Sequence, residues 1–254
     1  INGIRGMVEI AGHYKDNPVK QQECLEKIQE SSGLLLELVN EVLDMGKLES
    51  GEIVLESRPF HVLHLVNDIT TIIEKQAAER GIEIISGVPS VQHSCLIGSP
   101  IHIKRLLMNI VSNAVKYNHD GGSVTVTCRE VSYTDTTAEY ELTCTDTGIS
   151  MSEEFQKRAF EPFAQEGQLA RTKYAGTGLG LAIARKLIEL QGGTLFFESI
   201  QGKGTKFILH ISFEISAEEQ KKKFHMYQNC SVEGIQVLLV EDNELNMEIA
   251  EFLL

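Results

Sequence analysis

The sequence predicts an α+β fold, in which a long helical hairpin precedes a mixed domain with a core of its own. Apolar residues recur at helical spacing along one face from about residue 19 to residue 47. Beyond Gly51, segments of helical spacing are interspersed with segments in which apolar and polar residues alternate, which is typical of strands. The 254 residues, of which 42% are hydrophobic, are enough for one large domain or two small ones.

Composition excludes several classes of function. The 23 Lys and Arg against 36 Asp and Glu give a net charge of −13, which argues against a nucleic-acid groove and a polybasic membrane patch. No run of 18 apolar residues and no signal peptide are visible. The five cysteines are scattered, without a CxxC pair, so a reduced intracellular protein without structural zinc is expected. Because both ends fall inside apolar helical patterns, we expect a fragment.

The first two predicted helices form a hairpin. Residues 1–14 form one helix, 15–18 a turn, and about 19–47 the next helix. The second helix has a stripe that is too wide for one short partner, so we expect a second copy to complete a dimeric four-helix bundle. The alternative, that the stripe packs on the rest of the same chain, stays open. The stripe comprises Leu25, Ile28, Leu35, Val39 and Val42, widened by Cys24, Leu34, Leu36, Leu38 and Leu43.

The mixed domain follows from residue 58. Helices are predicted over about 60–80, 100–117, 152–160 and 179–190, with Ser152 as a cap of the third. Strands are predicted near 82–86 and over 124–131, 138–145, 194–200 and 205–214, with the second and third paired. A polar linker follows over 217–234, and then a buried-type strand over 235–240, whose short segment cannot build a core alone.

Three glycine loops stand out as candidate ligand contacts. They cover residues 146–148, 176–180 and 202–205, and glycine permits close backbone approach and positive φ. The second loop opens a helix, whose free N–H groups favour anions. None has the spacing of a Walker A loop or of the dinucleotide fingerprint. A single loop of this kind is more often a plain turn, but three together favour a phosphate site.

The helix over 100–117 carries a polar face opposite its apolar one. Asn109, Asn113, Lys116 and Tyr117 share this face at spacings of three and four. Amide oxygens can ligate Mg²⁺, and lysine can neutralise phosphate. Asp146, which ends a strand, could accept a hydrogen bond from an exocyclic amine such as that of adenine. A solvated helix face and a turn aspartate are the alternatives.

These segments together resemble sensor histidine kinases. The segment 109–117 (NIVSNAVKY) resembles their N box, Asp146-Thr-Gly148 the first glycine box, and Phe160-Glu-Pro-Phe163 the phenylalanine box. Residues 176–181 and 202–205 resemble the second and third glycine boxes. Five boxes in order are a strong signal. The hairpin resembles the dimerisation and phosphotransfer domain, and 235–243 the first strand and acidic pair of a receiver domain.

The resemblance implies a hybrid kinase with a defined order of domains. These are a truncated hairpin domain over 1–57, an ATP-binding α/β two-layer sandwich over 58–216, a linker over 217–234, and a truncated receiver domain over 235–254. It implies a cytoplasmic kinase core that transfers the ATP γ-phosphoryl group to a histidine and onward to a receiver aspartate. A receiver domain or response regulator and a second copy of the chain are the implied partners. Anchoring of the intact protein in the inner membrane is compatible with this resemblance.

The resemblance also implies a role for each residue of the boxes. Asn113 would ligate Mg²⁺ bridging the ATP phosphates, and Asp146 would hold the adenine amine. Phe160 and Phe163 would hinge a mobile ATP lid over 164–176 against the core. Glu241 and Asp242 would be Mg²⁺ ligands in an intact receiver. The other implied ATP contacts are Asn109, Lys116, Tyr117, Gly148, Gly176, Thr177, Gly178, Leu179, Gly180 and Thr205.

The sequence departs from the family pattern at several points. Ile1-Asn2-Gly3 resembles the segment just after the H box of the family, so the resemblance implies that the phosphoacceptor histidine lies upstream of Ile1. His13 lies too far along the helix to replace it. Ser150 stands where the first glycine box usually has a second glycine. If that position needs positive φ, its Cβ costs about 1–2 kcal/mol, so Ser150→Gly would tighten ATP binding roughly tenfold or more. Ser99 stands where an aspartate cap is common.

Two other functions are compatible with the same boxes. One is an ATPase of the same superfamily, which would need a helix-borne glutamate as its base. Asn109 stands where that glutamate would be, and so disfavours hydrolysis. The other is a non-catalytic scaffold for nucleotide binding or dimerisation, which the departure at Ser150 suggests.

Overall fold

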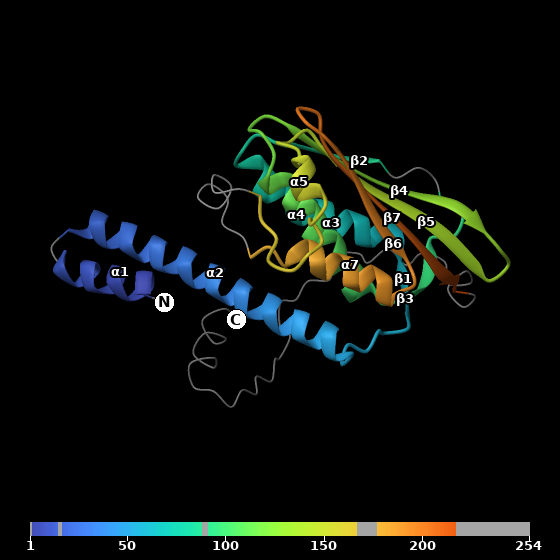
Figure 1. Cartoon of the computed structure of the whole chain (residues 1–254), viewed down its shortest axis with the longest axis horizontal. Coiled ribbons are helices and arrows are strands. Elements are labelled where there is room, and N and C mark those ends of the chain that lie inside the picture. The colour runs from blue at the N-terminus through green and yellow to red at the C-terminus, as the bar shows by residue number, and fades with distance from the viewer. Residues whose placement is uncertain (1, 15–16, 88–90, 167–176, 217–254) are drawn as a thin grey trace, which may run out of the picture. The chain divides into compact units, whose positions relative to one another are not determined.

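The structure is a computed structural model that describes residues 2–14, 17–87, 91–166 and 177–216 (Figure 1). The predicted linker and receiver segment, with Glu241 and Asp242, lie outside the described residues, as do Gly176 and residues 167–175 of the predicted lid. Within the described ranges, none of the helices is long and apolar enough to cross a membrane.

The helical hairpin consists of α1 (Asn2–His13) and α2 (Pro18–Ser50), which pack against each other (Figure 1). Asn17 caps α2 by accepting a hydrogen bond from the Lys20 amide at 3.1 Å, and Pro18 occupies the first turn. Gly51 ends the helix with a φ of 73°. Both helices were predicted, although α2 continues for three residues beyond Lys47, and residues 15 and 16 of the predicted turn lie outside the described residues.

The mixed domain is built on one seven-stranded sheet in the order β1-β3-β7-β5-β4-β2, with β6 also paired to β7. The pairs are antiparallel except β2 with β4, which is parallel. The strands are β1 (Arg58–His61), β2 (Glu83–Gly87), β3 (Cys95–Gly98), β4 (Ser123–Tyr133), β5 (Thr137–Asp146), β6 (Thr194–Ile200) and β7 (Gly204–Ile215).

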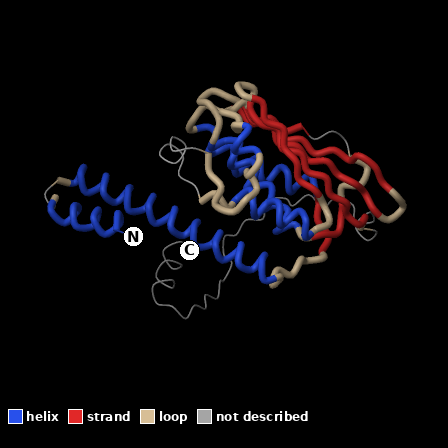
Figure 2. Tube along the Cα trace, viewed as in Figure 1, coloured by secondary structure: helices blue, strands red, loops and turns tan. Residues whose placement is uncertain are grey.

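Helices α3 (Val62–Ala78), α4 (Pro100–Lys116) and α7 (Gly180–Leu190) cover one face of this sheet (Figure 2). The long central strands turn alternate side chains toward them, as in the buried Val124, Val126 and Cys128 of β4. The intervening Thr125 and Thr127 are only partly buried. This is the predicted two-layer sandwich, with the core between the helices and the sheet.

Two short strands were missed in the sequence. The segment predicted as one helix from about residue 60 begins as β1, in which Phe60 is buried and pairs with Leu96 of β3. Four residues are too few for an alternating pattern to be recognised.

The predicted helix over 152–160 is only α5 (Glu153–Gln156), and Ser152 caps it as predicted by accepting from the Phe155 amide at 3.2 Å.

Candidate nucleotide site

A single cavity brings together most of the residues singled out from the sequence. Its volume is about 770 Å³, within the usual range of small-molecule sites. It lies against α4, the loop after β5, the loop that enters α7, and the start of β7. The predicted residues that line it are Asn109, Asn113, Lys116, Tyr117, Asp146, Thr177, Gly178, Gly180 and Thr205.

Helix α4 presents its polar face to this cavity and its apolar face to the core. Leu106 and Ile110 are fully buried on the core side. Asn109 lies beside the start of α7, where a Cβ on Gly180 would be 3.9 Å from the Asn109 Oδ1 atom. In the part of the chain that the structure describes, Asn109 Nδ2 is the one buried side-chain nitrogen or oxygen without a hydrogen-bond partner. Such a group is expected to find a partner in a ligand or in water.

Arg80 anchors the end of α4 and also lines the cavity. Its guanidinium donates to the carbonyl oxygens of Val115 at 2.8 Å, Lys116 at 3.1 Å and Asn118 at 2.7 Å. It also pairs with Asp120 at 2.8 Å. These bonds provide donors for carbonyl groups at the end of the helix. The positive charge of Arg80 also interacts favourably with the negative end of the helix dipole. The sequence analysis did not single out Arg80.

Asp146 is buried at the end of β5, with 7% of its surface exposed. Its Oδ1 atom accepts from the Gly148 amide at 2.8 Å and the Thr205 amide at 3.2 Å. Burial raises the pKa of Asp146 above its usual value, and these two donors oppose that rise. The carboxylate is therefore a strong acceptor held by the first and third glycine loops together.

Gly148 is needed for packing of the loop. A Cβ at this position would lie 2.4 Å from the Tyr117 carbonyl oxygen and 2.9 Å from Asp146 Oδ1. Its neighbour Thr147 accepts from the Ser123 amide at 2.9 Å and donates to Asn118 Oδ1 at 3.2 Å. The loop after β5 is thereby fixed to the segment that follows α4. Gly148 itself does not line the cavity.

The loop that enters α7 approaches another stretch of backbone. Gly178 has a φ of 75°, and a Cβ there would meet the Ala164 carbonyl oxygen at 2.7 Å. Thr177 accepts from the Leu179 amide at 3.1 Å, and Leu179 is buried in the core and does not line the cavity. The first turn of α7 therefore starts at the cavity, where its amide groups suit an anion.

The two phenylalanines predicted to hinge the lid differ in environment. Phe160 packs against Phe197 with ring centroids 5.4 Å apart, and Arg185 lies 5.0 Å from the centre of its ring. Phe163 is 62% exposed and has a φ of 63°. Contrary to the expectation from the sequence, its side chain therefore does not pack against the core. Neither residue lines the cavity.

Ser150 has the positive φ that the sequence comparison suggested, at 61°. Its hydroxyl donates to the Ile200 carbonyl oxygen at 2.8 Å and accepts from the Gly204 amide at 3.0 Å. Glycine would relieve a strain of about 1–2 kcal/mol but would lose two bonds of about 0.5–1.5 kcal/mol each. The two effects are of similar size, so the tenfold gain expected from the sequence no longer follows.

Ser99 does not cap α4. Its hydroxyl instead lies 2.7 Å from His102 Nδ1 and accepts from the Glu56 amide at 3.2 Å. The N-terminus of α4 therefore lacks a side-chain cap, as the absence of an aspartate at this position suggests. The hydroxyl connects the segment after α2 to the first turn of α4.

Two acidic residues of α2 also reach this region. Glu41 lines the cavity and accepts a hydrogen bond from the Thr177 hydroxyl, and Asp44 forms an ion pair with Arg105 of α4. Burial lowers the pKa of Arg105, and the charge of Glu41 opposes this. Neither acid was singled out in the sequence, because charged residues along a helix carry no distinctive pattern.

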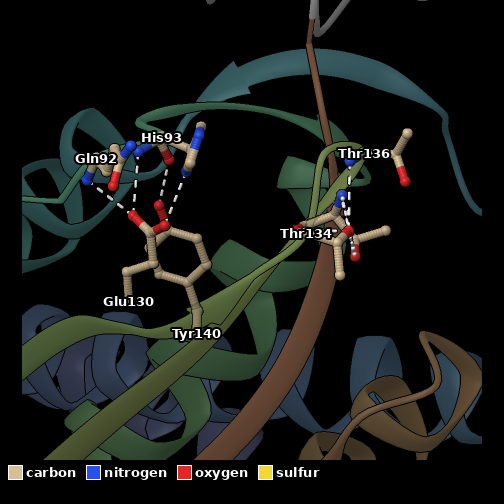
Figure 3. Close-up of polar contacts among 7 residues, drawn as sticks. Gln92, His93, Glu130, Thr134, Thr136 and Tyr140 are labelled. Atoms are coloured by element: carbon tan, nitrogen blue, oxygen red, sulfur yellow. Dashed lines mark hydrogen bonds and ion pairs between the residues drawn. The ribbon is translucent and has the colours of Figure 1, made fainter.

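A second polar cluster lies away from the cavity, where residues 92 and 93 meet β4 and β5 (Figure 3). Glu130 accepts from the Gln92 amide at 2.8 Å, the His93 amide at 3.0 Å and His93 Nδ1 at 2.8 Å. Tyr140 donates to the His93 carbonyl oxygen. Burial acts to raise the pKa of Glu130, but these hydrogen bonds outweigh it and lower the pKa. The cluster fixes residues 92 and 93 to β4 and β5 and holds no predicted site residue.

Two family profiles match the chain. The profile of the His Kinase A (phospho-acceptor) domain matches residues 1–51. That of the histidine kinase-, DNA gyrase B- and HSP90-like ATPases matches residues 98–215. The first coincides with the hairpin, and the second begins just before α4 and ends with β7, so it contains most of the cavity.

Curated relatives are similar over most of the chain. The signal transduction histidine-protein kinase BarA of Escherichia coli K12 is 30% identical over 216 residues, which is 85% of this chain and 23% of BarA. The sensor protein GacS of Pseudomonas syringae is 30% identical over 251 residues, 99% of this chain and 27% of GacS. The chain thus spans about a quarter of the length of these relatives.

Solved structures share the fold. Full-length ShkA, crystallised in complex with AMPPNP, is 28% identical with a TM-score of 0.65, over 85% of this chain and 43% of that one. The histidine kinase AdeS of Acinetobacter baumannii has a TM-score of 0.62 at 21% identity, over 82% and 92% of the two chains.

Proposed function

Because this chain belongs to the histidine kinases, we propose that it is the ATP-dependent phosphotransfer core of a two-component phosphorelay. It would place the γ-phosphoryl group of ATP in line with a histidine, from which the group would pass to a receiver aspartate. The observation that carries this proposal is the convergence of the α4 polar face, Asp146 and the α7 N-terminus on one cavity. Complex formation of ShkA with AMPPNP, an ATP analogue, is consistent with it.

Different residues around the cavity would contact different parts of the ATP molecule. The buried Asp146 carboxylate would accept from the adenine amine. Lys116 and the first-turn amides of α7 would neutralise the phosphates, and Asn109 Nδ2 would gain the hydrogen-bond partner it lacks. Transfer of a phosphoryl group depends chiefly on such positioning and charge neutralisation.

A magnesium ion fits this arrangement through the nucleotide. The described residues hold no group of three or more His, Cys, Asp or Glu side chains that could bind a metal ion by themselves. Mg²⁺ commonly takes one or two protein ligands and completes its shell with phosphates and water. We infer that the Asn113 amide oxygen is its protein ligand, with Asn109 beside it. The ion, when bound, would offset the negative charge of the phosphates.

The hairpin carries the surface for the first proposed partner, which is a second copy of the chain. Several apolar side chains of α2 remain exposed, including Leu25 at 56%, Leu36 at 64% and Leu43 at 56%. We infer that a second copy covers them in a four-helix bundle, which agrees with the match of the phospho-acceptor family to this hairpin. The receiver partner would be the domain that begins at residue 235 in the longer protein, or a separate response regulator.

The test is to incubate purified protein with γ-labelled ATP and Mg²⁺ and to follow acid-labile, base-stable label. Label is expected on a longer protein that includes the segment before Ile1, but not on this chain alone. Stoichiometric label on this chain that is lost in His13→Gln would refute the expected position of the acceptor. Rapid ATP hydrolysis without labelled protein in the longer form would favour an ATPase instead.

A further inference from the structure

The β6–β7 turn and the loop after β5 are joined at both ends of the turn by one side chain. The Ser150 hydroxyl bonds to Ile200, the last residue of β6, and to Gly204, the first residue of β7. We call this pair of hydrogen bonds the Ser150 bridge. A φ of 61° is unfavourable for serine. The two hydrogen bonds of the Ser150 bridge must therefore compensate for the cost of this backbone conformation.

The bridge acts next to the atoms that hold Asp146. Gly204 lies directly on the end of β5, where a Cβ would be 1.9 Å from the Asp146 carbonyl oxygen. The following amide, that of Thr205, is one of the two donors to Asp146 Oδ1, and the other donor, Gly148, belongs to the same loop as Ser150. The bridge therefore joins the two segments that supply both donors.

A second link reinforces the first. The Met151 amide donates to the Ser199 hydroxyl at 2.8 Å, and this hydroxyl lies 2.9 Å from Thr205 Oγ1. Ser150, Met151 and Thr205 all line the cavity. The loop after β5 and the β6–β7 turn thus form one connected wall of the cavity, with the Asp146 carboxylate between them.

We propose that Ser150 is a positioning residue that aligns Asp146 for the base of the nucleotide and so sets the preference for adenine over guanine. This inference rests on the proposed nucleotide-binding function. Adenine offers an amine where guanine has a carbonyl oxygen, so only adenine can donate to the Asp146 carboxylate there. Loosening of the wall costs ATP this hydrogen bond, whereas GTP has none to lose.

The experiment compares ATP and GTP affinities by calorimetry for the full chain and three variants. Ser150→Ala keeps the Cβ and removes the hydroxyl, and Ser150→Gly removes both the hydroxyl and the strain. Ser132→Ala is the matched control, because the Ser132 hydroxyl donates to Glu139 at 2.6 Å on strand segments that do not line the cavity. Thermal melts confirm that each variant is folded at the temperature of the titration.

We expect Ser150→Ala to weaken ATP about tenfold and GTP less than about twofold, so that the ATP preference falls several-fold. Ser150→Gly should lose a similar part of the preference, although it binds ATP more tightly than Ser150→Ala does. Ser132→Ala should leave the preference unchanged.

Equal weakening of ATP and GTP in Ser150→Ala would make Ser150 merely structural and overturn the inference. A Ser150→Gly variant that binds ATP more tightly than the unmodified chain, with its preference intact, would also overturn it. Failure of the unmodified chain to bind ATP would refute the proposed function itself, an outcome that is distinct from an unchanged preference in a chain that does bind.

Discussion

At the scale of single residues, the site depends on polar groups held where water is scarce. Asn109 and Asn113 lie on the cavity side of a helix whose other side is core, so their position is fixed by the packing of Leu106 and Ile110. Asp146 is held by two backbone donors. Substitutions at these positions should therefore change ligand binding more than folding.

Asn113→Ala should abolish the Mg²⁺-dependent part of ATP binding and leave the fold intact. The variant removes the one amide oxygen proposed to ligate the ion, while alanine is a good helix former. Calorimetry with and without Mg²⁺ measures the effect. Asn67→Ala, on the exposed face of α3, is the matched control and should bind as the unmodified chain does. Unchanged affinity of Asn113→Ala with Mg²⁺ present would contradict the assignment.

Asp146→Asn should weaken ATP binding about 10- to 100-fold while raising the melting temperature at neutral pH. The raised pKa means that ionisation of Asp146 disfavours the folded state. The protonated Asp146 side chain therefore stabilises the fold at low pH, and this stabilisation is lost as the pH rises through the raised pKa. The neutral amide removes that loss. The gain in melting temperature should therefore shrink as the pH falls below the raised pKa.

Melting and nucleotide titrations over a pH series check this prediction. Asp135→Asn, in an exposed turn, should alter neither quantity. ATP binding to the unmodified chain should also weaken as Asp146 becomes protonated at low pH, because a protonated carboxyl group is a poorer acceptor. A lower melting temperature in Asp146→Asn at neutral pH would show that its two hydrogen bonds outweigh the cost of burying its charge.

At the scale of elements, α4 is the centre of the site, and Arg80 binds the end of this helix. The three carbonyl oxygens bound by its guanidinium belong to the last residues of the helix and the segment after it. Lys116 and Tyr117, which line the cavity, lie within this stretch. The position of the proposed phosphate contact of Lys116 thus depends on a residue just beyond the end of α3.

Arg80→Met should destabilise the domain by about 2–3 kcal/mol and weaken ATP binding, because several charge-assisted bonds to the helix end are lost. Arg80→Lys should recover only part of the loss, since one ammonium group cannot reproduce the planar fork. Chemical denaturation and calorimetry report the two effects. Arg129→Met is the control, because its ion pair with Glu141 lies on the exposed face of the sheet.

Most elements could be predicted from local patterns, and the missed ones show where such patterns fail. Strands β4, β5, β6 and β7 are long enough for alternation to be visible. By contrast, β1 and β3 have four residues each and are recognisable only by their pairing with each other and by that of β3 with β7. In the site, the boxes identified α4, Asp146 and the glycine loops. Arg80, Glu41 and the bonds of the Ser150 hydroxyl depend on residues distant in sequence, which no local spacing encodes.

At the scale of the whole molecule, the exposed apolar face of α2 is the proposed surface for assembly. Leu36 and Leu43 are 64% and 56% exposed, and they lie seven residues apart on one side of the helix. A face of this kind is stable in water only when it is covered. The proposed dimer therefore depends on side chains that contribute little to the fold of a single copy.

Leu36→Asp should convert the dimer to a monomer while ATP binding changes by less than about twofold. A carboxylate at a bundle core position would be buried without a partner, which costs several kcal/mol. Light scattering measures the mass. Val54→Asp is the control, because Val54 is 83% exposed and lies beyond the end of α2. A monomeric unmodified chain, or a dimeric Leu36→Asp variant, would contradict the proposed interface.

The position of β7 in the sheet has a consequence for synthesis on the ribosome. The last strand of the domain lies inside the sheet, with β5 on one side and β3 and β6 on the other. Until residues 204–215 leave the exit tunnel, β5 lacks its β7 neighbour and remains an open edge. One of the two donors to Asp146, the Thr205 amide, arrives with that strand. The proposed contact between Asp146 and the base of ATP therefore requires that this final strand is inserted first.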